Sequence, residues 1–192
     1  GAIPRTGVLR QSQSLDTIGV FAPQPQDAAL LAEVLFGHDA GDPYTSLAPH
    51  PALLKTATEA PPVRPRLATV KPPGWDGLAD DDTRSAFAEL ADALGEDHCF
   101  EAPLPGIFDE ARGVQGRINR AEMARNYHSY ARRGADQLST EIREAMEEGR
   151  AVSAPDYIAA LEWGDTLYSG LEKILDRCDA ILAPAAPGPA PE

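Results

Sequence analysis

The sequence is short of cysteine and histidine, and it has no long hydrophobic run. Its two cysteines, Cys99 and Cys178, lie far apart and outside any CxxC pair, so we expect free thiols in the reducing environment of the cytoplasm. The four histidines show no metal-ligand spacing. No apolar stretch approaches the about 18 residues that predict a membrane-spanning helix. These shortages argue against a disulfide scaffold, a metal site and a helical membrane protein.

Positive charge is also scarce. The 192 residues include 17 Lys and Arg against 30 Asp and Glu, which gives a formal net charge of −13. A surface this acidic repels phosphate backbones. We therefore do not expect direct binding to nucleic acid.

Common catalytic motifs are missing as well. The sequence contains no GxSxG, P-loop, HExxH or GxGxxG pattern. The segment "SQSLD" offers Ser12 and Ser14 as nucleophiles beside Asp16, but no suitable general base lies nearby in the sequence. We favour a polar turn here, in which Asp16 accepts hydrogen bonds from backbone N–H groups.

Two acidic clusters could be interpreted as metal sites. The run at 80–82 precedes a helical pattern, so it more simply supplies an N-cap and the negative first turn that a helix dipole favours. His38 with Asp39 and Asp42 is likewise interpreted as a polar turn, because carboxylates this close need a closed oxygen cage to hold a cation. We expect no metal in either cluster.

The hydrophobic periodicity predicts an α/β fold. Predicted strands lie at 17–22, 67–71, 98–102 and 180–183. Predicted helices lie at 26–36 and 80–94, over most of 107–149 with a break at 132–134 and a short helix at 138–148, and from Ser153 onward. Residues 38–66 are expected to form a long irregular connection. Strands that alternate with a helix favour parallel pairing in one sheet.

Three of the predicted helices carry more specific expectations. Two should bury one apolar face each, formed by Leu30, Leu31, Val34 and Leu35 in the first and by Phe87, Leu90, Ala91 and Leu94 in the second. In the last helix, Ser153 and Asp156 have the spacing of a capping box.

The sequence resembles the amidase signature family. The stretch "GAIPRTGVLRQSQSLDTIGVFA", followed by "DAALLAEVLFGHDAGDP", is similar to the family's G-x-x-P/S-x-x-G, S-L-D-x-x-G-P-x-A and D-A-A-L-L-x-x-x-x-G-x-D blocks. Later stretches, "LSTEIREAMEEGRAVSAPDYIAAL" and "CDAILAPAAPGPAP", resemble the family's later helices and a strand end more loosely. Val20 stands where the family favours Pro, and "PQPQ" stands where it favours a turn with Arg.

The resemblance implies a partial amidase-signature fold, with a mixed and mostly parallel sheet flanked by helices and truncated at both ends. On this interpretation residues 1–66 form the post-nucleophile strand, helix and long loop. Residues 67–106 form a strand–helix–strand unit, residues 107–178 a helical roof over the pocket, and residues 179–192 a strand end and loop.

The resemblance also implies the chemistry. The family uses a Ser–cis-Ser–Lys triad without metal or organic cofactor, and the triad is expected upstream of Gly1, so no residue here inherits a catalytic role. Ser14 and Asp16 are expected to be structural residues near the active site. Ile118 and Glu122 are candidates for the substrate pocket. The alternative for Glu122 is a solvated ion-pair network with Arg117, Arg120 and Arg125.

The implied substrate is a small carboxamide, and the implied partner is the remainder of the amidase chain, with a homodimer as a further option. Two other functions stay open. One is a piece of the A subunit of a tRNA-dependent amidotransferase, which would work with partner subunits. The other is a non-catalytic α/β interaction module.

Overall fold

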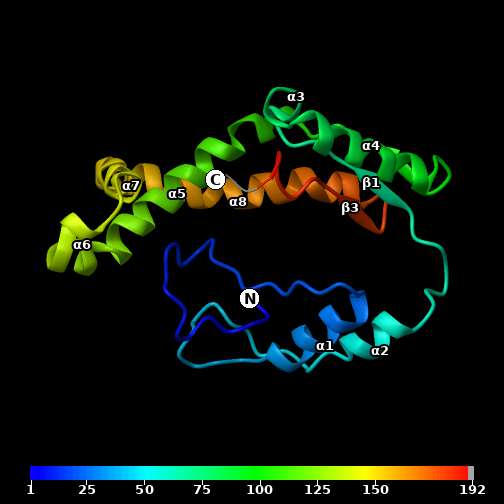
Figure 1. Cartoon of the computed structure of the whole chain (residues 1–192), viewed down its shortest axis with the longest axis horizontal. Coiled ribbons are helices and arrows are strands. Elements are labelled where there is room, and N and C mark those ends of the chain that lie inside the picture. The colour runs from blue at the N-terminus through cyan, green and yellow to red at the C-terminus, as the bar shows by residue number, and fades with distance from the viewer. Residues whose placement is uncertain (190–192) are drawn as a thin grey trace. The chain divides into compact units, whose positions relative to one another are not determined.

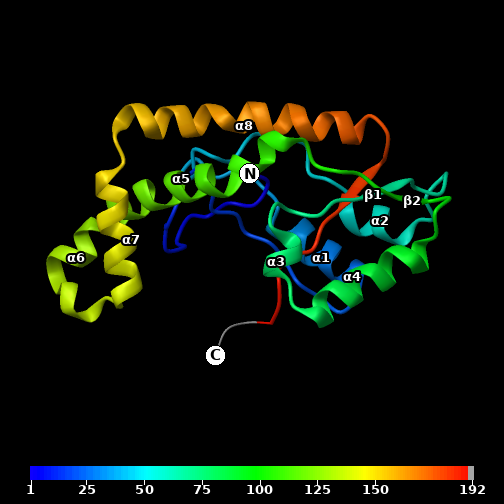
Figure 2. The same cartoon turned by 90° about the horizontal axis from the view of Figure 1, so that it is seen from above.

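The computed structural model describes residues 1–189, which divide into two compact units. Unit 1 contains Gly1–Ala60 and Gly116–Tyr157, and unit 2 contains Pro61–Gln115 and the chain from Ile158 onward. Figure 1 and Figure 2 show the elements of each unit.

Unit 2 contains a parallel sheet of three short strands. These are β1 (Leu67–Thr69), β2 (Cys99–Glu101) and β3 (Ala180–Leu182), in the order β2-β1-β3. In the register, Ala68 of β1 pairs with Phe100 on one side and Ile181 on the other. Three of the four predicted strands are thereby confirmed as neighbours in one parallel sheet, each within its predicted range.

Helices cover this sheet in the same unit. They are α3 (Trp75–Leu78), α4 (Asp81–Leu94), the 3₁₀ helix η1 (Gly106–Glu110) and the greater part of α8 (Ala154–Leu175). The core consists of Ala68, Val70, Ala102 and Ile174. Asp80 caps α4 as expected, since its Oδ1 accepts the Thr83 N–H at 2.6 Å.

Unit 1 is helical apart from its long loops. It holds α1 (Pro25–Leu35), α2 (Leu53–Thr58), most of α5 (Ala111–Asn126), α6 (His128–Gly134), the 3₁₀ helix η2 (Ala135–Gln137) and α7 (Thr140–Ala151). Met123, Ala124 and Met146 form its core, where α5 packs against α7. Gly149 permits this close approach, because a Cβ at that position would collide with the Arg120 carbonyl.

Several local predictions are confirmed. The first helix begins and ends within one residue of its predicted bounds, and α6 ends at Gly134 in the predicted break. Ser153 Oγ donates to Asp156 Oδ2 at 2.6 Å, and the Asp156 N–H donates to Ser153 Oγ at 3.2 Å, as a capping box requires. None of the helices among residues 1–189 is both long and apolar enough to span a membrane.

Two segment predictions are wrong. Residues 17–22 form no strand, because a strand needs a hydrogen-bonded neighbour and none of the described strands pairs with this segment. The connection at 38–66 contains a helix, α2, which packs against α1. Glu33 Oε2 accepts the Leu54 N–H at 2.8 Å and so caps α2 from another helix, which no local pattern could indicate.

The predicted apolar faces exist but are not buried. Leu30, Leu31, Val34 and Leu35 of α1 are all exposed, and Leu90 of α4 is 47% exposed. Neither α1 nor α4 contains a buried residue. Periodicity identifies the apolar side of each helix correctly, but this side is exposed on α1 and only partly covered on α4, where Phe87, Ala91 and Leu94 are half-buried.

Candidate functional site

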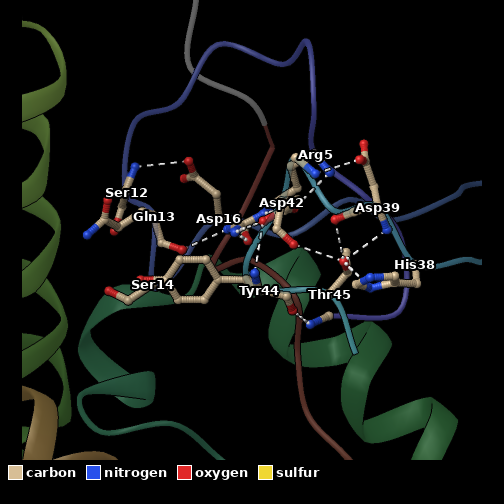
Figure 3. Close-up of polar contacts among 12 residues, drawn as sticks. Arg5, Ser12, Gln13, Ser14, Asp16, His38, Asp39, Asp42, Tyr44 and Thr45 are labelled. Atoms are coloured by element: carbon tan, nitrogen blue, oxygen red, sulfur yellow. Dashed lines mark hydrogen bonds and ion pairs between the residues drawn. The ribbon is translucent and has the colours of Figure 1, made fainter. Parts of the chain in front are cut away.

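The "SQSLD" segment folds into a tight turn that Asp16 closes. The Leu15 and Asp16 N–H groups both donate to the Ser12 carbonyl, at 3.2 and 2.7 Å. In return, Asp16 Oδ2 accepts the N–H groups of Gln11 and Ser12, each at 2.9 Å, and Figure 3 shows the bond from Ser12. The expected acceptance of backbone N–H groups by Asp16 is confirmed, whereas its position near an active site stays a prediction.

Glu122 of α5 also binds this turn. Its carboxylate Oε2 accepts the Ser12 hydroxyl at 2.6 Å and the Ser14 N–H at 3.0 Å. Its Oε1 accepts the Ser14 hydroxyl at 2.6 Å and the Tyr157 hydroxyl at 2.5 Å. Ser12 is completely buried and Glu122 is 3% exposed. We call these four residues the Glu122 network.

The network has a settled protonation state at neutral pH. Burial raises the pKa of Glu122, but the hydrogen bonds from Ser12, Ser14 and Tyr157 outweigh it, so the pKa lies below its ordinary value. Burial, and then the hydrogen bond to Glu122, raise the pKa of Tyr157 to about 12. The carboxylate is therefore ionised and the phenol protonated. A carboxylate with four donors and a lowered pKa is a poor general base, so the network holds geometry rather than activating either serine.

Arg5 ties the same turn to a second loop. Its Nε and Nη2 donate to the two carboxylate oxygens of Asp42, at 3.0 and 2.9 Å, and its N–H donates to Asp42 Oδ2 at 2.9 Å. Its Nη1 donates to the carbonyls of Gln13 and Asp16, each at 2.8 Å. Figure 3 shows Arg5 between the two loops. This arrangement holds the pKa of the buried Asp42 carboxyl well below its usual range, chiefly through the Arg5 side chain.

The second loop is the polar turn that the sequence predicted. The Asp42 N–H donates to the Asp39 carbonyl at 2.9 Å, and the Gly41 N–H donates to Asp39 Oδ1 at 2.7 Å. Thr45 Oγ1 lies 3.2 Å from His38 Nδ1 and donates to the Asp42 carbonyl at 2.9 Å. Within residues 1–189, no group of three or more His, Cys, Asp or Glu side chains is arranged to hold a metal ion.

A cavity of about 280 Å³ opens beside these loops. Ser14, Asp16 and Arg5 contribute to its wall, together with Tyr44 and Ile18. The cavity lies entirely within unit 1. The residues that order the turn therefore also form the boundary of a space large enough for a small organic molecule.

The structure brings together residues that sequence reasoning considered separately. Ser12, Ser14, Asp16 and Glu122 meet at one turn, and Ile118 is buried one helical turn before Glu122 on α5. The partners of Glu122 are hydroxyl and amide groups, and the ion pair of Arg120 is instead with Glu148.

Sequence reasoning missed Arg5, Tyr157 and Asn126, whose Nδ2 donates to the Gln11 carbonyl at 3.0 Å. Arg5 and Tyr157 reach partners 37 and 35 residues away, so neither carries a local signal.

Comparison with known proteins relates the whole chain to one family. The Amidase family model matches residues 1–192. The A subunit of the glutamyl-tRNA(Gln) amidotransferase of Cutibacterium acnes is 27% identical over 97% of this chain and 42% of its own length. An amidase of Pseudomonas putida is 24% identical over 99% of this chain and 41% of its own length.

A solved amidase structure has the same fold. It superposes on 100% of this chain with a TM-score of 0.73 and 27% identity, and this chain covers 40% of it. The chain thus spans about two fifths of the length of the relatives it matches. Because the family model extends over every residue, the chain belongs to the amidase family, as its opening sequence indicated.

Proposed function

We propose that this chain is the part of an amidase that follows the catalytic segment, in an enzyme that hydrolyses carboxamide C–N bonds by serine acyl transfer in the cytoplasm. The observation that carries the proposal is the match of the family model to all 192 residues. In this reaction a serine oxygen attacks the amide carbon and the amine leaves. Water then releases the carboxylic acid from the acyl-enzyme. On this proposal the nucleophile and its cis-Ser and Lys partners belong to the preceding part of the parent chain.

The two serines of the turn are poor substitutes for that nucleophile. Ser12 is completely buried, and both hydroxyls donate to the ionised Glu122 carboxylate. A nucleophile needs access to substrate and a base that can take its proton. The role that fits their geometry is to hold the turn at 11–16, and with it the wall of the adjoining cavity. On this proposal Ser14 and Asp16 support the active site, and Ile118 and Glu122 belong to the layer behind the pocket.

Exposed apolar side chains are evidence that this chain packs against further protein surface. Phe21 is 98% exposed, and the apolar face of α1 adds Leu30, Leu31 and Val34. Monomeric soluble proteins rarely expose large contiguous apolar surface. The remainder of the amidase chain is the occupant that we propose for these surfaces, with a second copy of the chain as the alternative.

A second function has one specific observation in its favour. The A subunit of a glutamyl-tRNA(Gln) amidotransferase matches at 27% identity over 97% of this chain. A chain of that kind would release ammonia from an amide donor and act with partner subunits that hold the tRNA. Its net charge of −13 is compatible with this role only if those partners make the nucleic-acid contacts.

Activity and labelling assays on the parent protein test both functions. The purified parent should hydrolyse members of a carboxamide panel that includes acetamide, benzamide and glutamine, and a serine-directed phosphonate should label a residue upstream of Gly1. Activity restricted to glutamine, together with co-purifying subunits, would favour the amidotransferase. If the parent protein showed neither turnover nor phosphonate labelling, a non-catalytic interaction module would be the remaining function. Labelling at Ser12 or Ser14 would overturn the proposed role of the turn.

A further inference from the structure

A cavity between α6 and α7 is lined by positive charge in a strongly acidic chain. It has a volume of about 230 Å³ and lies entirely within unit 1. The two helices lie side by side in both Figure 1 and Figure 2. Arg132, Arg143 and Arg150 line the cavity, with Glu147 as its one carboxylate. The chain as a whole carries a net charge of −13, so this concentration of guanidinium groups is local.

Two of the three guanidinium groups form no direct ion pair in the described part of the chain. Glu147 forms an ion pair with Arg150 on the same helix, so these two charges cancel. Within residues 1–189, no ion pair engages Arg132 or Arg143. The cavity therefore presents two positive charges to whatever enters it, which favours an anion.

Arg143 is already held in position. Its Nη1 donates to the Ala135 carbonyl at 3.3 Å, and its Nη2 donates to Thr140 Oγ1 at 3.2 Å. A guanidinium group carries five N–H donors, so further donors remain for a ligand after these two bonds. Because the fork is fixed before binding, the Arg143 side chain loses less conformational entropy when a ligand engages it.

Apart from His128, the rest of the lining is apolar. Met146 is 1% exposed and contributes to the wall together with Ala131 and Ala135. An inorganic phosphate would leave this surface without a partner, whereas a carboxylic acid with a short aliphatic body would cover it. The cavity volume limits that body to a few carbon atoms.

We propose that this cavity binds a small organic carboxylate, with the carboxylate on Arg132 and Arg143 and the aliphatic body against Met146 and Ala131. Guanidinium groups match carboxylates through paired N–H···O bonds, which are stronger than bonds between neutral groups. The proposal does not depend on amide hydrolysis, because it is tested by a measurement of binding alone.

Isothermal titration calorimetry on the full natural chain tests the proposal with isobutyrate as the probe. Isobutanol has a matching aliphatic body without the charge, and inorganic phosphate has the charge without the body. Isobutyrate should bind, and isobutanol should bind roughly tenfold more weakly or worse, since a charge-assisted hydrogen bond contributes about 1.5–3 kcal/mol. Inorganic phosphate should also bind more weakly than isobutyrate, because it leaves the apolar wall of the cavity uncovered. Absence of isobutyrate binding, or equal binding of phosphate, would overturn the proposal.

A pair of neighbouring variants assigns the binding to this cavity. Arg132→Gln should weaken isobutyrate binding roughly tenfold, because it removes one of the two guanidinium groups that form no direct ion pair among the described residues. Arg133→Gln is the matched control. Arg133 is the next residue of α6 after Arg132. Its Nε donates to the Ser129 carbonyl, and its guanidinium group lies over the Tyr130 ring rather than in the cavity. Both arginines are exposed, so both variants should fold normally. An equal loss of isobutyrate affinity in both variants would mean that the ligand is attracted by positive charge in general, and it would refute the assignment of binding to this cavity.

Discussion

Replacement of Glu122 by alanine is expected to destabilise the protein strongly, because one carboxylate accepts four hydrogen bonds. The hydroxyls of Ser14 and Tyr157 are only partly buried and can turn toward water. The Ser12 hydroxyl is completely buried, so it loses its acceptor without replacement, and the partly buried Ser14 N–H, which the backbone holds in place, loses its acceptor as well.

The magnitude follows from these two donors. A buried donor without a partner costs about 1–3 kcal/mol, so Glu122→Ala should lower the free energy of unfolding by roughly 1–3 kcal/mol through the Ser12 hydroxyl, with a smaller further loss from the partly buried Ser14 N–H. This is a large share of the about 5–15 kcal/mol by which folded proteins are stable. Glu122→Gln should cost less, roughly 1–2 kcal/mol, because the amide oxygen can keep two bonds and the amide nitrogen can donate to the rotated hydroxyls.

Urea unfolding of the parent chain, followed by circular dichroism, measures the effect. Glu148→Ala is the matched control. Glu148 is exposed and paired with Arg120, so its removal should change the free energy of unfolding by less than about 1 kcal/mol. If Glu122→Ala behaved like this control at pH 7, the Glu122 network would not stabilise the turn and the reasoning would be refuted.

The pH dependence gives an independent check. The pKa of Glu122 in the folded state lies below its ordinary value of 4.5. Its ionised form therefore contributes stability above pH 4.5, and that contribution is lost as the pH falls through the folded-state pKa. The difference in unfolding free energy between wild type and Glu122→Gln should accordingly shrink below pH 4.5. A difference that stayed constant or grew in acid would contradict the lowered pKa.

Three further predictions concern the neighbouring loops and the exposed surfaces. Asp16→Ala should lower the free energy of unfolding by roughly 1–3 kcal/mol, because the Gln11 and Ser12 N–H groups lose their acceptor; a parent enzyme with wild-type stability and no turnover would instead mark Asp16 as catalytic. In the Arg5→Lys variant, the single ammonium group cannot make the paired bonds that the guanidinium group makes to Asp42. An NMR titration should therefore find a higher pKa for Asp42 than in wild type. An unchanged pKa would contradict the conclusion that Arg5 lowers it. The isolated 192-residue chain should bind a dye for exposed apolar surface and self-associate in light scattering, whereas a cooperatively folded monomer without dye binding would show that its apolar faces need no cover.

Local and regular features could be predicted from the sequence. The caps formed by Asp80 and by Ser153 with Asp156 depend on groups within three residues of one another, so their spacing alone is informative. The parallel sheet could be predicted because strands alternate with helices along unit 2. The opening blocks around Ser14 and Asp16 identified the amidase family, which the family match confirmed over the whole chain.

Features that depend on distant partners were decided by the tertiary structure. Residues 17–22 have the composition of a strand, but strand formation also requires a neighbour to bond their N–H and C=O groups. The apolar faces of α1 and α4 follow from periodicity, whereas their burial depends on what packs against them.

The candidate site shows most clearly which features the sequence could predict and which depended on the tertiary structure. Composition and motif made Ser12, Ser14, Asp16 and Glu122 candidates, but Ser12 and Glu122 are 110 residues apart and meet only in the folded chain. Once they meet, burial and four hydrogen bonds set the charge of the carboxylate and hold the turn. The sequence by itself determined the family and the local elements, because these depend on residues close together in the chain. Only the tertiary structure decided what Glu122 does, because a carboxylate's role depends on the donors that surround it in space.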